Sequence, residues 1–328
     1  MKLFKSGKVF AFGEYAVVKG YPSLILKTHR GLHFELEAAA VFEVKSSQLD
    51  YIYSDSMNPT SKVEKAIHQA LAYLKALKIG VKYCRIFITS TLERSDTTSL
   101  GLGSSGAFVV GIIEAILLWN DVTISPLKLF KLAVLSHQAD FDLTSYGDFA
   151  VSAFSQHLYY QKMSSIPKGE LIDVLHQEWP DLEVKPFDMV FPWALVHINE
   201  KQSSYDLVKQ VFQTNHSFEE LFQAMTRVTK SALEAIRNQD KKSFLDCVNQ
   251  AQKHMEVLSS LTNAPIMVHA YHAVLERTKH MGIACKISGA GGGDNLICFG
   301  SIELLEALRE TLQSHYIVFE GGLHESER

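Results

Sequence analysis

A glycine-rich stretch that runs straight into an apolar segment has the residue types of a phosphate-binding loop. It reads Ser-Leu-Gly-Leu-Gly-Ser-Ser-Gly-Ala from Ser99 to Ala107, and the apolar segment continues to Trp119. Glycine permits backbone conformations and close ligand approach that a Cβ would block, and N–H groups at a helix start attract anions. The hydroxyls of Ser104 and Ser105 could hold phosphate oxygens or a magnesium ion. The stretch predicts a phosphate site at the start of a buried helix.

The loop by itself leaves more than one interpretation open. It also matches the Gly-x-Gly-x-x-Gly fingerprint of dinucleotide-binding folds, with Asp121 about twenty positions further on. That fold places the glycines directly after a strand, whereas here a polar segment separates the expected strand 83–89 from Gly101. No Gly-Lys-Ser/Thr follows, which excludes a Walker loop. A phosphate loop, a tightly packed helix entry and a nicotinamide site remain.

Two further segments, one near each end of the sequence, accompany this loop in one known family. Residues 6–18 read Ser-Gly-Lys-Val-Phe-Ala-Phe-Gly-Glu-Tyr-Ala-Val-Val, and residues 286–294 read Lys-Ile-Ser-Gly-Ala-Gly-Gly-Gly-Asp. Together with the glycine loop they resemble the three motifs of the GHMP kinases, in the same order and across almost the whole chain. That superfamily includes galactokinase, homoserine kinase, mevalonate kinase and phosphomevalonate kinase. The resemblance implies ATP-dependent phosphorylation of a small molecule.

The middle of the sequence resembles one branch of that superfamily. Residues 145–152, Ser-Tyr-Gly-Asp-Phe-Ala-Val-Ser, are similar to the Ser-x-Gly-Asp segment of bacterial phosphomevalonate kinases, whereas mevalonate kinases usually carry Ser-Gly-x-Asp-Asn. Residues 203–208 resemble a helix entry found in both groups. The resemblance implies transfer of a phosphoryl group from ATP to 5-phosphomevalonate, giving 5-diphosphomevalonate, with mevalonate kinase activity as the alternative.

A protein of the same fold that binds a nucleotide or metabolite without catalysis is a different class of function. The joint presence of Lys8, Ser105 and Asp148 argues against it, because a pure binder has no need of a proton-accepting aspartate. A lysine or aspartate in a chain with 32 Lys and Arg and 36 Asp and Glu is usually a solvated surface charge. Only the positions of these residues inside the motifs favour a catalytic role.

Phosphoryl transfer needs a phosphate cradle, a metal ion, a group acting on the acceptor and a cation. The resemblance implies that Asp148 accepts the proton of the acceptor or orients its oxygen. Lys8 would keep that carboxylate ionised and stabilise the transferring group. ATP would be held by Gly101, Gly103, Ser104, Ser105 and Gly106, with Mg²⁺ on Ser105. The acceptor would be bound by Glu14, Tyr15, Arg94, Ser145, Gly147, Ser203, Ser204, Gly291 and Gly292. Ser203 and Ser204 also fit a helix N-cap.

The sequence departs from the family pattern at three places. Bacterial phosphomevalonate kinases usually carry a lysine just before the glycine loop, where residues 97–100 read Thr-Thr-Ser-Leu. Arg94 is our candidate for the replacement cation, because a guanidinium can bind phosphate through two hydrogen bonds. Ser6 stands where proline is usual, and His137 stands where mevalonate kinases carry an acidic metal ligand. Magnesium would then be held chiefly by Ser105, the nucleotide and water.

Composition and charge exclude several classes of partner. The formal net charge of −4 provides no basic field for nucleic acid, and no apolar run is long enough to span a membrane. The N-terminus lacks the apolar segment of a secretion signal. The cysteines stand singly in apolar stretches, which predicts reduced core residues: Cys84, Cys247, Cys285 and Cys298. We expect a cytoplasmic enzyme with a small-molecule substrate, as a monomer or homodimer.

Hydrophobic periodicity predicts the elements that must position these residues. Residues 3–53 alternate like strands, 61–77 have apolar positions at helical spacing, and 109–118 predict a helix buried on every side. After Pro186 the pattern changes to a strand, several helices, two strands, a helix and a last strand. This mixture predicts an α+β protein. The resemblance implies two GHMP kinase lobes, a ribosomal-protein-S5-like lobe over 1–185 and a ferredoxin-like lobe over 186–328.

Overall fold

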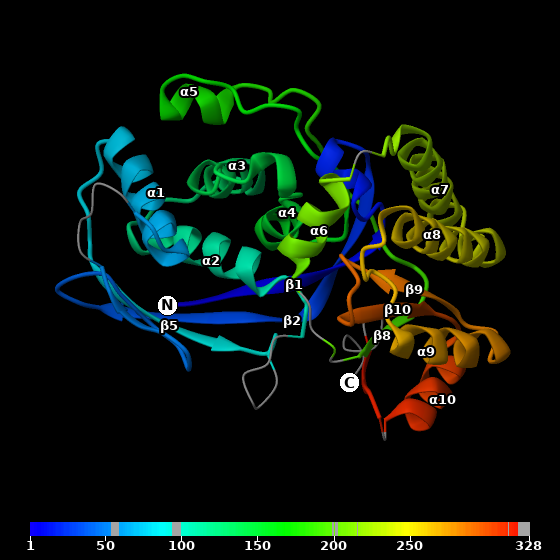
Figure 1. Ribbon diagram of the computed structural model, residues 1–328. Helices are drawn as coiled ribbons and strands as arrows, with labels where there is room; N and C mark the ends of the chain where they lie inside the picture. The colour runs from blue at the N-terminus through cyan, green and yellow to red at the C-terminus, as the bar shows by residue number, and fades with distance from the viewer. Residues whose placement is uncertain are drawn as a thin grey trace.

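The computed structural model describes residues 1–53, 59–93, 100–198, 200, 203–214, 216–313 and 315–320. This part of the chain forms two sheets, each covered by helices (Figure 1). The larger sheet has the order β4-β3-β5-β2-β6-β7, and β1 pairs with β2 off this path. Its strands are β1 (Lys2–Phe12), β2 (Ser23–Ala38), β3 (Glu43–Lys45), β4 (Asp50–Ile52), β5 (Cys84–Ser90), β6 (Leu158–Gln161) and β7 (Glu183–Pro186).

The first motif, residues 6–18, begins in β1, which pairs antiparallel with β2. In β2, Leu32, Phe34 and Leu36 are buried while the residues between them are exposed, as the alternation predicts. The pairing of β1 with β2 shifts register between Ser6 and Lys8. Such a bulge changes the direction of the neighbouring side chains. The shift therefore contributes to the direction in which the side chain of Lys8 leaves the sheet.

Helices cover one face of this sheet, with α2 innermost (Figure 1). Its residues Val109, Ile112, Ile113 and Ile116 have no exposed surface, which confirms the predicted buried helix. Because α2 contacts the sheet and three other helices, its first turn has a rigid position. The helical elements of this lobe are η1 (Ala16–Lys19), α1 (Lys62–Ala76), α2 (Ser104–Trp119), α3 (Pro126–Ser136), η2 (Phe141–Leu143), α4 (Gly147–Phe154) and α5 (Leu171–His176).

The smaller sheet belongs to the C-terminal lobe and has the antiparallel order β11-β8-β10-β9. Helices separate β8 from β9 and β10 from β11, which is the ferredoxin-like connection. The elements are β8 (Trp193–His197), α6 (Ser204–Phe212), α7 (Glu219–Arg237), α8 (Lys241–Thr262), α9 (His269–His280), β9 (Ala284–Ser288), β10 (Asn295–Phe299), α10 (Ile302–Leu312) and β11 (Ile317–Glu320). The predicted two-lobed α+β fold is confirmed, while the exact boundary after residue 185 stays a prediction.

The two lobes share apolar packing. The ring of Phe12 in β1 lies edge-on to that of Phe244 in α8, with 5.8 Å between the ring centroids. The ring centroids of Phe244 and Phe299 of β10 are 4.9 Å apart. All four cysteines are buried, as predicted. Within the described residues, no helix has the length and apolar character needed to cross a membrane. The shared core holds the ends of β1 and β9 together, and the candidate site lies there.

Candidate active site

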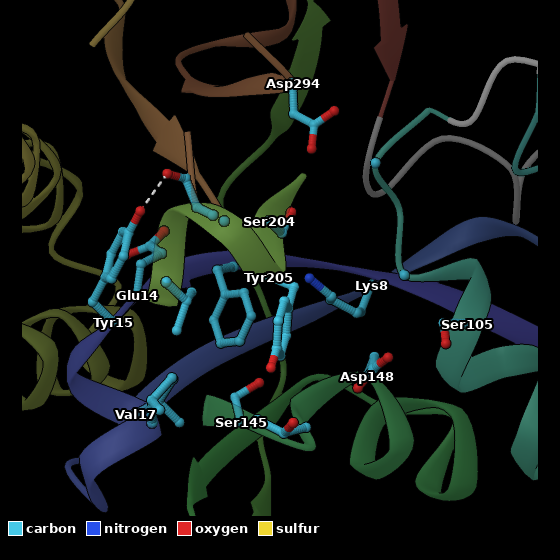
Figure 2. Close-up of a pocket in the computed structure, with 18 of the residues that line it drawn as sticks. Lys8, Glu14, Tyr15, Val17, Ser105, Ser145, Asp148, Ser204, Tyr205 and Asp294 are labelled. Carbon is cyan, nitrogen blue, oxygen red and sulfur yellow. Dashed lines mark hydrogen bonds between the residues drawn. The ribbon is translucent and has the colours of Figure 1, made fainter. Parts of the chain in front are cut away.

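A cavity of about 570 Å³ lies where the two lobes meet, and all three glycine motifs contribute to its wall (Figure 2). Figure 2 shows Lys8, Asp148 and Ser105 on one side of the cavity and Glu14 and Tyr15 on the other. A second cavity of about 310 Å³ shares Ser104 and Ser105 with the first. The start of α2 therefore lies between two adjoining cavities.

The glycine loop and Lys8 are held against each other by backbone contacts. The N–H of Lys8 donates to the carbonyl of Leu102 at 2.8 Å. Gly101 and Gly103 adopt φ values of 69° and 74°, which favour glycine. A Cβ on Gly103 would lie 2.9 Å from Cγ of Lys8, so a larger residue would displace the lysine. The loop thus presents the N–H groups of the first turn of α2 beside an ammonium group.

Asp148 lies in the first turn of α4 and packs against the first turn of α2. A Cβ on Gly106 would lie 2.6 Å from Cγ of Asp148, so this glycine allows the two helices to approach. The N–H of Phe149 donates to Oδ1 of Asp148 at 3.1 Å. The hydroxyl of Tyr160 donates to the carbonyl of Ser145 at 2.7 Å and anchors the segment before α4. The carboxylate is therefore fixed beside the glycine loop.

Lys8 and Asp148 form an electrostatically coupled pair in the cavity wall. Burial lowers the pKa of Lys8, and the negative charges of Asp148, Asp294 and Glu14 oppose this shift. Burial raises the pKa of Asp148, and the positive charge of Lys8 opposes it. Each charge thus favours the ionised form of its partner in a site whose burial disfavours both charges. A carboxylate with a raised pKa beside a cation is suited to accept or share a proton.

The third motif reaches the first motif across the lobe boundary. The buried side chains of Lys286 in β9 and Glu14 form an ion pair. The hydroxyl of Ser288 donates to the carbonyl of Phe10 at 2.8 Å, and that of Tyr15 donates to the carbonyl of Ala290 at 2.7 Å. These contacts set the distance between the two lobes at the end of the cavity away from α2.

The ion pair of Glu14 and Lys286 leads to a stability prediction. We expect Lys286→Met to lower the free energy of unfolding by about 3 kcal/mol, because it leaves the carboxylate of Glu14 buried without its ion-pair partner. Urea denaturation measures the effect. The control is Lys2→Met, which removes an ion pair to Glu35 whose side chains are 81% and 58% exposed, and should change little. Equal losses in the two variants would contradict the prediction.

The third motif also contacts the glycine loop. The amide Nδ2 of Asn295 donates to the carbonyl of Leu100 at 2.7 Å. A Cβ on Gly101 would lie 3.0 Å from Cγ of Asp294. A strand of the C-terminal lobe therefore supports the loop from the side opposite α4, so both lobes determine its conformation.

The part of the cavity away from the glycine loop is lined by hydroxyl and apolar groups. Ser145, Ser203, Ser204 and Tyr205 contribute hydroxyls. Ser203 also caps α6, because its hydroxyl accepts from the N–H of Asp206 at 3.3 Å. The apolar part of this wall consists of Phe10, Val17, Val18, Leu143 and Val208. This end suits a small, partly apolar acceptor with oxygen substituents.

A buried lysine supports this end of the cavity from behind. The ammonium of Lys162 donates to the carbonyl of Val18 at 3.2 Å and to that of Phe141. It thereby connects η1 to η2, whose residues line the cavity. Burial lowers the pKa of Lys162 to about 8.

Two models of protein domains match this chain. The model of the GHMP kinases N terminal domain matches residues 62–156, and that of the GHMP kinases C terminal domain matches residues 232–318. The two ranges together cover more than half of the sequence, and they carry the glycine loop, Asp148 and the third motif. The chain belongs to the GHMP kinases.

Individual relatives of this GHMP kinase are similar over most of their length. A phosphomevalonate kinase of Streptomyces sp. (strain CL190) is 22% identical over 326 residues, covering 88% of this chain and 86% of the relative. A mevalonate kinase of Saccharolobus solfataricus is 25% identical over 323 residues, covering 92% and 90%. The structure of Streptococcus pneumoniae phosphomevalonate kinase in complex with phosphomevalonate and AMPPNP superimposes with a TM-score of 0.86 at 22% identity, covering 98% and 99%.

Most of the residues predicted for the site of this kinase line the larger cavity. They are Lys8, Glu14, Tyr15, Gly101, Gly103, Ser104, Ser105, Ser145, Asp148, Ser203 and Ser204. Gly106 does not line it, and its place is the contact between α2 and Asp148. Arg94 lies outside the described residues.

Three glycines predicted to bind substrate also lie outside the lining, and packing explains them. A Cβ on Gly147 would lie 2.6 Å from Cδ1 of Ile25, so this glycine allows α4 to pack on β2. Gly291 has φ 81°, and its Cβ would lie 2.5 Å from the carbonyl of Ile266. The N–H of Gly292 donates to that same carbonyl at 3.0 Å. From this loop, Gly289, Ala290 and Asp294 reach the cavity instead.

Several residues of the lining were absent from the predicted site: Lys62, Tyr205, Ser288 and Asp294. Ser288 and Asp294 stand within the third motif, so attention to its polar residues could have found them. Lys62 stands about forty residues before the glycine loop in an ordinary helix start, and no sequence pattern singles it out.

The described residues fit a magnesium site in which the nucleotide and water supply most of the ligands. No group of three or more His, Cys, Asp and Glu among them could hold a metal. Ser105 offers its hydroxyl to the cavity, and magnesium characteristically keeps water and phosphate oxygens as ligands. His137 lines neither cavity. Its ring packs on Phe149 at 5.6 Å, and burial lowers its pKa to about 4.

Proposed function

We propose that this kinase transfers the γ-phosphoryl group of ATP to the phosphate of 5-phosphomevalonate, giving ADP and 5-diphosphomevalonate. The observation that carries the proposal is the placement of Lys8 and Asp148 against the glycine loop in one cavity. The phosphomevalonate kinase of Streptomyces and that of S. pneumoniae, which binds phosphomevalonate and AMPPNP, support the choice of substrate.

In this proposal the nucleotide and the acceptor occupy neighbouring parts of the two cavities. The triphosphate lies at the start of α2, with its nucleoside in the smaller cavity, and the acceptor lies between Ser145 and Ser204. Asp148 orients the attacking oxygen and takes its proton where the acceptor phosphate carries one. Lys8 stabilises the negative charge of the group in transfer. Magnesium, held by Ser105, water and the nucleotide, would neutralise phosphate charge.

Mevalonate is the second candidate acceptor, and specific observations favour it. The relative from Saccharolobus solfataricus, a mevalonate kinase, is 25% identical to this chain. Residues 97–100 lack the lysine that bacterial phosphomevalonate kinases usually carry. A hydroxyl acceptor would make the role of Asp148 as proton acceptor obligatory, because an alcohol does not ionise near neutral pH.

Release of ADP tests the proposal directly. The full-length chain is incubated with ATP and magnesium, and mevalonate, 5-phosphomevalonate, homoserine and galactose are offered separately. Turnover with 5-phosphomevalonate alone is the expected result. Turnover with mevalonate alone would transfer the assignment to the second candidate. No turnover with any of the four would contradict both.

A further inference from the structure

Lys62, the first residue of α1, lies at the junction of the two cavities. The larger and the smaller cavity share three lining residues: Lys62, Ser104 and Ser105. A ligand that extends from one cavity into the other must pass these side chains. Since the junction lies at the start of α2, the phosphate chain of a nucleotide is the part that would pass it.

The fold holds Lys62 in this place. The hydroxyl of Ser61 and the carboxylate of Glu64 form a capping box that sets where α1 begins. Helix α1 packs along α2. The ammonium of Lys62 donates to the hydroxyl of Ser105 at 2.7 Å, although the two residues are 43 positions apart in the sequence. Its side chain is exposed, so it can exchange this partner for a ligand.

Among the described residues that line the larger cavity, negative side chains outnumber positive ones. The larger cavity is lined by three carboxylates, those of Glu14, Asp148 and Asp294. Of its cations, Lys8 lies beside Asp148 at the acceptor side. Among the described residues, Lys62 is the one cation that lines the smaller cavity. Without Lys62, the described lining residues would offer a triphosphate at the start of α2 a cation on the acceptor side alone.

We propose that Lys62 binds the β- and γ-phosphates of the nucleotide. On binding, its ammonium exchanges the hydroxyl of Ser105 for phosphate oxygens, and that hydroxyl becomes available to magnesium. Lys8 and Lys62 then flank the group in transfer from opposite sides. The inference rests on the nucleotide binding that the proposed function includes, and not on turnover or on the identity of the acceptor.

Binding of AMPPNP with magnesium tests the role of Lys62 without any acceptor. We expect Lys62→Met to raise the Kd for AMPPNP about 10- to 100-fold, which is the usual effect of losing hydrogen bonds to a charged group. Lys62→Arg should retain most of the affinity. The control is Lys65→Met, one turn further along the same helix and outside both cavities, which should bind AMPPNP like the native chain. Isothermal titration calorimetry measures all four proteins.

Steady-state kinetics with the acceptor that the native enzyme uses provide the second readout. We expect Lys62→Met to raise the KM for ATP and lower kcat while the KM for the acceptor stays nearly constant. A Kd and KM for nucleotide within twofold of those of Lys65→Met would overturn the proposal. So would a change confined to the KM for the acceptor.

The two tests separate this inference from the proposed function. If no acceptor is turned over but the native chain binds AMPPNP and Lys62→Met does not, the proposed function fails and the role of Lys62 holds. If the native chain binds no AMPPNP with magnesium, both fail.

Discussion

Asp148→Asn is expected to lower kcat by about 10²- to 10⁴-fold, the range of a lost acid–base contribution. The amide has nearly the same shape and can keep the contact with the N–H of Phe149, so the packing of α4 on α2 should survive. The Kd for AMPPNP should change little, because the proposed nucleotide site lies at the start of α2. Initial rates of ADP release and calorimetric titration measure the two quantities.

The size of the loss in kcat on Asp148→Asn should depend on the acceptor and on pH. A fully ionised phosphate has no proton to give, so with 5-phosphomevalonate the loss should be smaller at pH 8 than at pH 6, whereas with an alcohol it should stay large at both. Ser204→Ala provides a control on the opposite wall of the same cavity, expected to act mainly on the KM for the acceptor. Full turnover by Asp148→Asn would remove Asp148 from the reaction.

Lys8→Met is expected to lower kcat by about 10²- to 10³-fold, since it removes a preorganised charge from the group in transfer. It should also move the acidic limb of the pH–rate profile to higher pH. Burial raises the pKa of Asp148 and the charge of Lys8 lowers it, so removal of Lys8 raises that pKa further. The ionised, active form of Asp148 is then lost at a higher pH as the solution is acidified.

A profile of kcat between pH 5 and pH 9 measures this shift. Lys27→Met is the matched control, because Lys27 pairs with Lys8 in the sheet register but does not line the cavity. It should leave kcat and the acidic limb in place. A profile of Lys8→Met that falls in amplitude without moving would mean that Lys8 does not act on the ionisation of Asp148.

Much of the fold could be predicted because its signals are local. The alternation of Leu32, Phe34 and Leu36 marks a strand with one buried face, and the unbroken apolar run in α2 marks a helix buried on every side. The start of α9, at His269, is an element boundary that has no comparable local signal. Asn263 has a left-handed conformation, and Ala264 to Val268 form the connection that receives the Gly292 hydrogen bond. That connection is set by a distant loop and not by local propensity.

Within the cavity, the sequence was sufficient to predict candidate residues from the motifs. Lys8, Ser105 and Asp148 stand in short patterns whose residue types are needed for phosphate binding and proton transfer, and such patterns can be recognised without knowing the packing. Of the glycines in those patterns, Gly101 and Gly103 have the positive φ values that favour glycine, and their predicted role in nucleotide binding stays a prediction. Close packing requires glycine at Gly147 and Gly291. The residues that they pack against are distant in the sequence, so the sequence does not reveal this packing.

The tertiary structure alone decided which charges meet. Lys62 reaches Ser105 because α1 packs on α2, and Lys286 reaches Glu14 because β9 of one lobe lies beside the end of β1 in the other. Electrostatic interactions depend on distance and burial, and both are set by the packing of elements far apart in the chain. The sequence therefore predicts the glycine loop, Lys8 and Asp148, whereas the contacts of Lys62 and Lys286 form only when the chain is folded.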